Sequence, residues 1–137
     1  MPLVWNDSYS VKVSEIDEQH KKILELINKL QSGLRTAEAE ELVPEIIKEL
    51  LVYVDVHFVS EEKYMQDANY PEYDKHKHSH NLIAEKVSKI QEDSANHKIT
   101  FKDMLELYLF LQEWLKSHIL HEDMLYVPYM KEFHDLA

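Results

Sequence analysis

Four stretches of the sequence repeat large apolar residues at steps of three and four, the period of an α-helix with one face turned to a core. The stretches begin near Ser14, between Ala37 and Pro44, at Tyr73 and after Thr100. Because proline is tolerated only in the first turn of a helix, we expect the second helix to start close to Pro44. The single glycine of the chain disfavours a sandwich or barrel built on tight hairpins.

Capping signals mark the expected helix ends. Ser14, with Asp17 three residues later, forms an acidic variant of the capping box, and this helix should end at or just after Gly33. Thr100 should cap the last helix together with Asp103.

Short polar stretches separate the helices, and the sequence therefore predicts an all-α, antiparallel up-down four-helix bundle. The polar run at 92–98 should be the loop before the last helix, and Pro128 should end or kink that helix, leaving a short C-terminal tail. The segment before Ser14 lacks a helical period and should lie as an extended arm along the bundle. We expect residues 1–137 to form a single domain.

Charge and composition exclude several classes of function. The formal charge of −11 disfavours nucleic acid and anionic membrane surfaces as partners. The absence of cysteine excludes disulfides, thiolate metal sites and iron–sulfur clusters, and it fits a cytoplasmic location. We find no signal peptide and no apolar run long enough to span a membrane.

Polar residues occupy positions in the apolar stripes where a core residue is expected. They are His20, His57, Glu61, His76, His80 and His118. A single buried histidine is usually hydrogen-bonded to a carbonyl group and has no further role. Five histidines and a carboxylate on facing stripes need a common partner, because each unpaired group costs about 1–3 kcal/mol. A metal site is the simplest common partner.

Helical spacing supports a shared metal site. His57 and Glu61 are four residues apart, as are His76 and His80, so the members of each pair lie within about 40° of each other on a helix. His78 lies about 200° from His76 and faces outward. In an up-down bundle, all six positions fall at the same end.

Five imidazoles and one carboxylate exceed one tetrahedral site, so two bridged ions are expected. A second carboxylate should come from Glu122 or Asp123. Spacing slightly prefers Glu122, four residues after His118, whereas Asp123 needs a local adjustment; the choice stays open at this level. Neither the HExxH zinc-protease motif nor Glu-x-x-His pairs occur, magnesium and calcium prefer oxygen ligands, and zinc and iron remain.

The chain resembles the hemerythrin family, and its bacterial members in particular. The matching segments, in the family's order, are IDEQH ending at His20, HFVSEEKYM from His57, YPEYDKHKHSH ending at His80, and WLKSHILHED ending at Asp123. The resemblance covers nearly the whole chain and includes the N-terminal segment VWNDSYSVKV.

The resemblance implies a di-iron centre in which one iron binds His76, His80 and His118. The other iron binds His20 and His57. Glu61 and Asp123 bridge the two ions together with an oxo or hydroxo group, so the family pattern selects Asp123 over Glu122. The second iron then keeps one open position, and in hemerythrins O2 binds there.

The resemblance also places an apolar O2 pocket beside the open position, lined by Leu115, Ile119 and Trp114. Trp114 should pack against a ligand histidine, and Tyr126 is a candidate hydrogen-bond donor to the site. The remaining histidines have no place in the family pattern, and we interpret them as surface residues: His78, His97, His121 and His134.

The function implied by the resemblance is reversible O2 binding, for storage or delivery, by a cytoplasmic protein. The alternative is an O2 or redox sensor domain of a longer, chemotaxis-type signalling protein, to which this chain could be fused. We do not expect an enzyme, since the Glu-x-x-His pairs of ferritin-like di-iron enzymes are missing.

Overall fold

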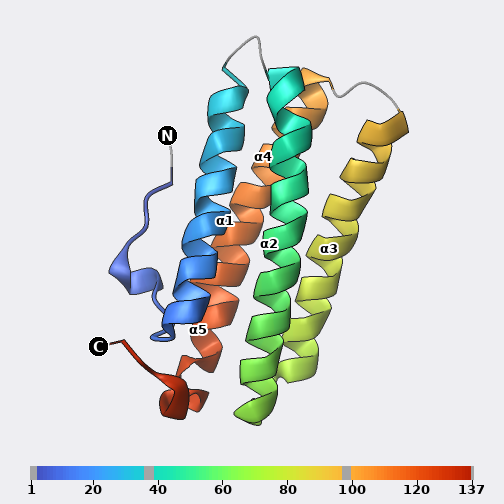
Figure 1. Cartoon of the computed structure of the whole chain (residues 1–137). Coiled ribbons are helices and arrows are strands. Elements are labelled where there is room, and N and C mark those ends of the chain that lie inside the picture. The colour runs from blue at the N-terminus through green and yellow to red at the C-terminus, as the bar shows by residue number, and fades with distance from the viewer. Residues whose placement is uncertain (1–2, 36–38, 97–99, 137) are drawn as a thin grey trace.

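The computed structural model describes residues 3–35, 39–96 and 100–136. It confirms the all-α, antiparallel four-helix bundle, with the N-terminal segment running alongside the first helix (Figure 1). The helical elements of the bundle are α1 (Ser14–Gly33), α2 (Ala39–Asp67), α3 (Tyr73–Asn96), α4 (Phe101–Trp114), a π-helical segment η2 (Leu115–Glu122) and the short α5 (Asp123–Tyr126). The expected capping box of Thr100 and Asp103 is present at α4.

The expected N-cap of α1 is wrong. The helix begins at Ser14 and ends at Gly33, but its N-cap is Val13, which makes no side-chain capping bond. Ser14 instead donates its hydroxyl to Asp135 over 2.6 Å, and Asp17 accepts a hydrogen bond from the hydroxyl of Ser10. Both side chains are used to hold the chain termini against α1 rather than to cap the helix.

Helices α2 and α3 are longer than the sequence suggested. Helix α2 begins at Ala39, so Pro44 lies inside it and not at its start. The proline lies beyond the first turn and leaves one backbone carbonyl without its helical N–H partner. The core packing of Ile46, Ile47 and Leu50, which follow it, offsets this loss. Helix α3 continues to Asn96 because residues 92–96 contain neither glycine nor proline; the rest of the expected loop lies outside the described residues.

Two apolar clusters fill the bundle, and a polar layer separates them. The smaller cluster is made of Val11, Val13, Ile16, Met65, Tyr70, Tyr126 and Met130. Along α1, Ile16 belongs to this cluster and Ile23 to the larger one, with His20 between them. Along α2, Glu61 lies in the same way between Phe58 and Met65. The polar stripe residues therefore meet at one level of the bundle.

The N-terminal arm is tied to α1 at its beginning. The backbone N–H of Leu3 donates to Oδ1 of Asn28 over 2.8 Å, and Nδ2 of Asn28 donates back to the carbonyl of Leu3 over 2.7 Å. The arm then passes Trp5, whose ring lies 5.2 Å from the ammonium group of Lys21. This arm forms one wall beside the polar layer.

The C-terminal tail starts with 3-10 turns at η3 (Val127–Tyr129) and η4 (Lys131–Phe133). Pro128 lies in η3, so the last helix ends where the proline predicts. Among the described residues, none of the helices combines the length and apolar character needed to cross a membrane.

Candidate metal centre

Seven polar side chains meet in the layer between the apolar clusters, and they come from α1, α2, α3, η2 and α5. Each is at most 3% exposed. Helix α1 contributes His20, α2 contributes His57 and Glu61, α3 contributes His76 and His80, η2 contributes His118, and α5 contributes Asp123. All six stripe residues singled out from the sequence are therefore brought together with Asp123.

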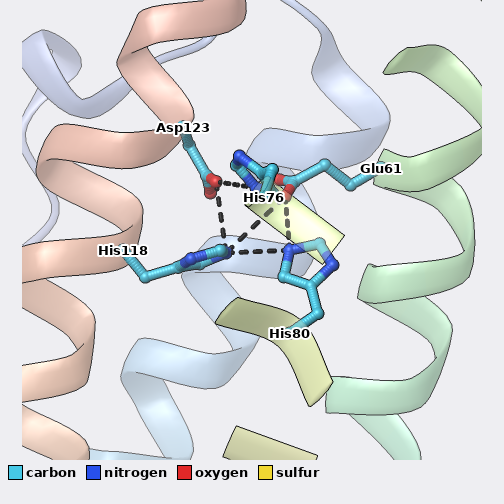
Figure 2. A group of neighbouring side chains, drawn as sticks. All are labelled: Glu61, His76, His80, His118 and Asp123. Carbon is cyan, nitrogen blue, oxygen red and sulfur yellow. Dashed lines mark hydrogen bonds and ion pairs between the residues drawn. The ribbon is translucent and has the colours of Figure 1, made fainter. Parts of the chain in front are cut away.

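The seven side chains form two groups that share both carboxylates. Figure 2 shows the larger group: Glu61, His76, His80, His118 and Asp123. In it, Nε2 of His76 lies 2.6 Å from Glu61 and 2.9 Å from Asp123. The smaller group consists of His20, His57, Glu61 and Asp123, and in it Nε2 of His20 lies 2.9 Å from Asp123. The larger group thus has one imidazole more than the smaller group.

Each carboxylate turns one oxygen to each group. Oε1 of Glu61 lies 2.9 Å from His80, whereas its Oε2 lies 3.3 Å from His57. Oδ1 of Asp123 lies 3.2 Å from His118, whereas its Oδ2 faces His20. This is the arrangement that two carboxylates need to hold a pair of cations between them.

The converging atoms fit metal ions better than they fit one another. The Nε2 atoms of His80 and His118 are 3.0 Å apart, and those of His20 and His57 are 3.2 Å apart. Ligands on an octahedral ion with bonds of about 2.1 Å have neighbours about 3 Å away. Both oxygens of Asp123 lack a well-oriented hydrogen bond among the described residues, although they are buried. A cation satisfies such a set of acceptors.

The pKa values of the histidines show that the two buried carboxylates favour positive charge in the layer. Burial lowers the pKa of His118, but Asp123 and the neighbouring glutamates outweigh it and raise the pKa to about 10. Burial and short contacts with the two carboxylates act in the same opposing way on His20 and raise its pKa to about 9. At His57 burial dominates and lowers the pKa to about 3. The carboxylates therefore draw cations, protons or metal ions, into a buried layer.

The π-helical segment η2 decides which acidic residue joins the groups. In an α-helix, residues five apart differ by about 140°. The N–H of Asp123 donates to the carbonyl of His118 five residues earlier, so the turn closes on i+5 and Asp123 shares a face with His118. Glu122 lies outside both groups and accepts a hydrogen bond from Ser79 instead.

Two of the three residues expected to line an O2 pocket lie with His20 in one cavity. Leu115 and Ile119 line this cavity of about 130 Å³, whose other wall includes Leu3 and Trp5 of the N-terminal arm. Trp114 lies elsewhere: its ring stacks on His118 at a centroid distance of 5.1 Å and an angle of 12°. It packs on a histidine of the larger group, as expected.

Three residues beside the polar layer were not singled out from the sequence. The ring of Phe58 stacks on His80 at 3.8 Å and 5°. Gln19 lies next to His57 and Glu62 next to His80. Their signal was position: each follows or precedes a stripe residue by one, which places it on the flank of the buried face.

Three of the other four histidines are described by the structure, and they lie outside the polar layer. His78 and His121 are exposed, as expected. His134 differs from the expectation, because it is half-buried and its Nε2 donates to the carbonyl of Val127 over 3.1 Å. His97 lies outside the described residues.

Comparison with known proteins identifies what the chain is similar to. Residues 11–130 match the family model of the hemerythrin HHE cation binding domain. The chain is 32% identical to a bacteriohemerythrin of Stenotrophomonas maltophilia over 94% of this chain and 82% of that protein. It is 30% identical to a bacteriohemerythrin of Clostridium acetobutylicum, with 90% and 98% covered. A crystal structure of a wild-type hemerythrin superposes with a TM-score of 0.80 at 26% identity, over 95% of this chain and 98% of that chain.

Proposed function

The chain belongs to the hemerythrin family, and on that premise we propose that it binds O2 reversibly at a non-haem di-iron centre. The observation that carries the proposal is the unequal division of ligands. The two groups share Glu61 and Asp123, but one has three imidazoles and the other two.

Each histidine of the two groups has a role in this proposal. His76, His80 and His118 hold one iron, and His20 and His57 hold the other. When bound, the iron pair supplies two electrons and an open coordination position for O2. The smaller group has one imidazole fewer, so the open position would lie on the side of His20 and His57. An open position is the mark of a metal site that binds a ligand.

The surroundings of His20 favour binding without further chemistry. Leu115 and Ile119 line the same cavity as His20 and give it an apolar wall beside the proposed open position. Five of the seven side chains are imidazoles, which in their neutral form add no negative charge to the ions. Few anionic ligands and a mainly apolar pocket wall disfavour the high oxidation states that O2 cleavage needs. We therefore propose a carrier and not an enzyme.

We propose that this binding serves O2 storage or delivery in the cytoplasm. The absence of cysteine is compatible with a reducing compartment. The unequal division of ligands between the two groups supports O2 binding in a carrier and in a sensor alike. O2 affinity and the domains encoded beside this one in the full gene distinguish the two roles.

Metal analysis with an optical spectrum tests the function. We expect about two irons per chain, by the ligand count above, and a visible charge-transfer band when the reduced protein meets O2. The band should disappear when O2 is removed. Zinc in place of iron, or no spectral change on aeration, would overturn the proposal.

A pair of variants tests the ligand assignment. Glu61→Ala removes a carboxylate shared by both groups and should abolish the iron pair. His78→Ala removes an exposed histidine of the same chain and should leave iron content unchanged. Equal iron content in both variants would contradict the assignment.

A further inference from the structure

The second ring nitrogens of two buried histidines have unlike partners. Nδ1 of His80 lies 3.0 Å from Oε2 of Glu62, whose other oxygen is 3.7 Å from the ammonium group of Lys77. Nδ1 of His57 lies 3.1 Å from Oε1 of Gln19. One histidine therefore faces a carboxylate and the other a neutral carboxamide, across the same polar layer.

A chain of hydrogen bonds sets the orientation of the Gln19 carboxamide. Its Nε2 donates to Oγ of Ser60 over 3.0 Å. Ser60 donates to Oε1 of Glu15 over 3.3 Å, and Tyr64 donates to the other oxygen of Glu15 over 2.6 Å. This series of hydrogen bonds runs from the surface of α1 and α2 to the interior.

The charge of Glu15 determines the direction of every hydrogen bond in this series. An ionised carboxylate only accepts, so the hydroxyl hydrogen of Ser60 points to Glu15. The oxygen of Ser60 must then accept from Gln19, which turns the carboxamide oxygen toward His57. Nδ1 of His57 consequently carries the hydrogen, and its Nε2 lone pair points into the polar layer. By the same rule, Glu62 places the hydrogen of His80 on Nδ1.

We propose that Glu62 and Gln19 are positioning residues that direct the lone pairs of His80 and His57 inward, and that their difference in charge makes the two metal positions electronically unequal. The inference rests on the proposed di-iron function. A carboxylate on Nδ1–H raises the basicity of Nε2, whereas an amide fixes the ring with a weaker effect.

The remaining histidines strengthen the asymmetry. Glu122 lies 3.8 Å from Nδ1 of His118, too far for a hydrogen bond but close enough to add negative charge on the same side as Glu62. Nδ1 of His20 has no hydrogen-bond partner among the described residues. Glu62 and Glu122 thus lie beside histidines of the larger group. Glu15, the carboxylate on the side of the smaller group, is separated from His57 by Ser60 and Gln19. Less negative charge therefore acts on the smaller group, which has the proposed open position and favours the reduced state that binds O2.

Two isosteric substitutions of opposite charge test the proposal. Glu62→Gln removes the negative charge at His80, and Gln19→Glu adds one at His57, without changing side-chain length. In the iron-loaded protein, Glu62→Gln should raise the first reduction midpoint potential and Gln19→Glu should lower it. A shift of about 59 mV corresponds to a tenfold change in the one-electron equilibrium. Shifts of the same sign in both variants, or no shift in either, would overturn the proposal.

The zinc-loaded protein gives a readout that does not depend on O2 or redox chemistry, because zinc accepts the same nitrogen and oxygen ligands. We expect the Nδ1–H proton of His80 to resonate downfield of that of His57, since its acceptor is charged. Glu62→Gln should move the His80 signal upfield. In Glu62→Asp, which keeps the negative charge, the signal should lie between those of the wild type and Glu62→Gln. Unchanged signals would overturn the inference, while failure of wild-type protein to bind iron or O2 would overturn only the proposed function.

A matched control separates the local contact from the change in net charge. Glu18→Gln removes the same charge from an exposed residue whose partner is Lys21, at 3.1 Å. Surface ion pairs of this kind contribute little, so folding, potential and histidine signals should stay at wild-type values. A shift in this control equal to that of Glu62→Gln would show a general charge effect and contradict the positioning role.

Discussion

The phenol of Tyr126 donates a hydrogen bond of 2.9 Å to Oε2 of Glu61. Tyr126 is fully buried and lies one helical turn after Asp123. The donor therefore meets the carboxylate oxygen on the side of His57 and His20, where the smaller group lies. Burial and the negative charge of Glu61 raise the pKa of Tyr126 well above its usual value, so the phenol keeps its hydrogen.

Tyr126→Phe should weaken the fold and the smaller metal position. Removing a buried donor to a charged acceptor costs about 1–3 kcal/mol of unfolding free energy. Urea unfolding of metal-free protein measures this loss, and iron release to a chelator should be faster than in the wild type. Tyr129→Phe is the matched control, because Tyr129 is exposed and should change stability by less than about 0.5 kcal/mol. Equal unfolding midpoints for the two variants would argue against the role of the phenol.

Asp123→Asn and Glu122→Gln should behave differently, although the residues are neighbours. Asp123 turns one oxygen to each group, so its neutral analogue should lower bound iron well below two ions per chain by removing a charged bridging ligand. Glu122 lies outside both groups and should retain the metal in its amide form. Elemental analysis of the two purified variants decides the matter. Iron loss in Glu122→Gln with retention in Asp123→Asn would reverse the assignment.

Asn28→Ala should loosen the N-terminal arm over the cavity that contains His20. The variant removes both hydrogen bonds to Leu3, about 1–3 kcal/mol together, so amide hydrogen exchange at Leu3 should rise roughly 5- to 150-fold. If the arm covers the route to the open position, O2 association measured by stopped flow should also be faster. Lys29→Ala, on an exposed neighbouring position, should change neither quantity. Unchanged exchange at Leu3 would show that Asn28 does not hold the arm.

Asp135→Asn should remove a stabilisation that is present at neutral pH and lost in acid. Hydrogen bonds from the hydroxyl and N–H of Ser14 lower the pKa of Asp135 in the folded protein. A lowered folded pKa favours folding above the unfolded value of about 3.9, and the contribution disappears as the pH falls through the folded value. Unfolding of the wild type and the variant at pH 7 and pH 3 gives the difference. A gap that widened in acid would contradict the expected sign.

The amino-acid sequence determined the bundle and most of the polar layer because both follow from helical period. Apolar steps of three and four define which face of each helix is buried, and any polar residue on that face has to find a partner inside. This argument identified His20, His57, Glu61 and the pair on α3 without tertiary information. The polar layer at one level also followed, since alternating helix direction fixes which ends meet.

Sequence signals for helix ends were less reliable where residues far away in the sequence interact with the same segment. Ser14 has the sequence of an N-cap, but its hydroxyl and N–H bind Asp135 at the other end of the chain. Pro44 suggests a helix start, yet the helix begins at Ala39, because core packing of the residues that follow the proline offsets the lost hydrogen bond. Such outcomes depend on contacts far apart in sequence.

Only the tertiary structure decided the last carboxylate and the partners of the outer ring nitrogens. Regular α-helical spacing favoured Glu122, which lies four residues after His118. The π-helical turn at η2 places Asp123, five residues after His118, in the polar layer instead. A change from i+4 to i+5 closure is a property of packing against the rest of the bundle and has no period of its own to detect. The carboxamide of Gln19 and the carboxylate of Glu62 likewise reach their histidines from other helices, at distances that side-chain packing alone determines.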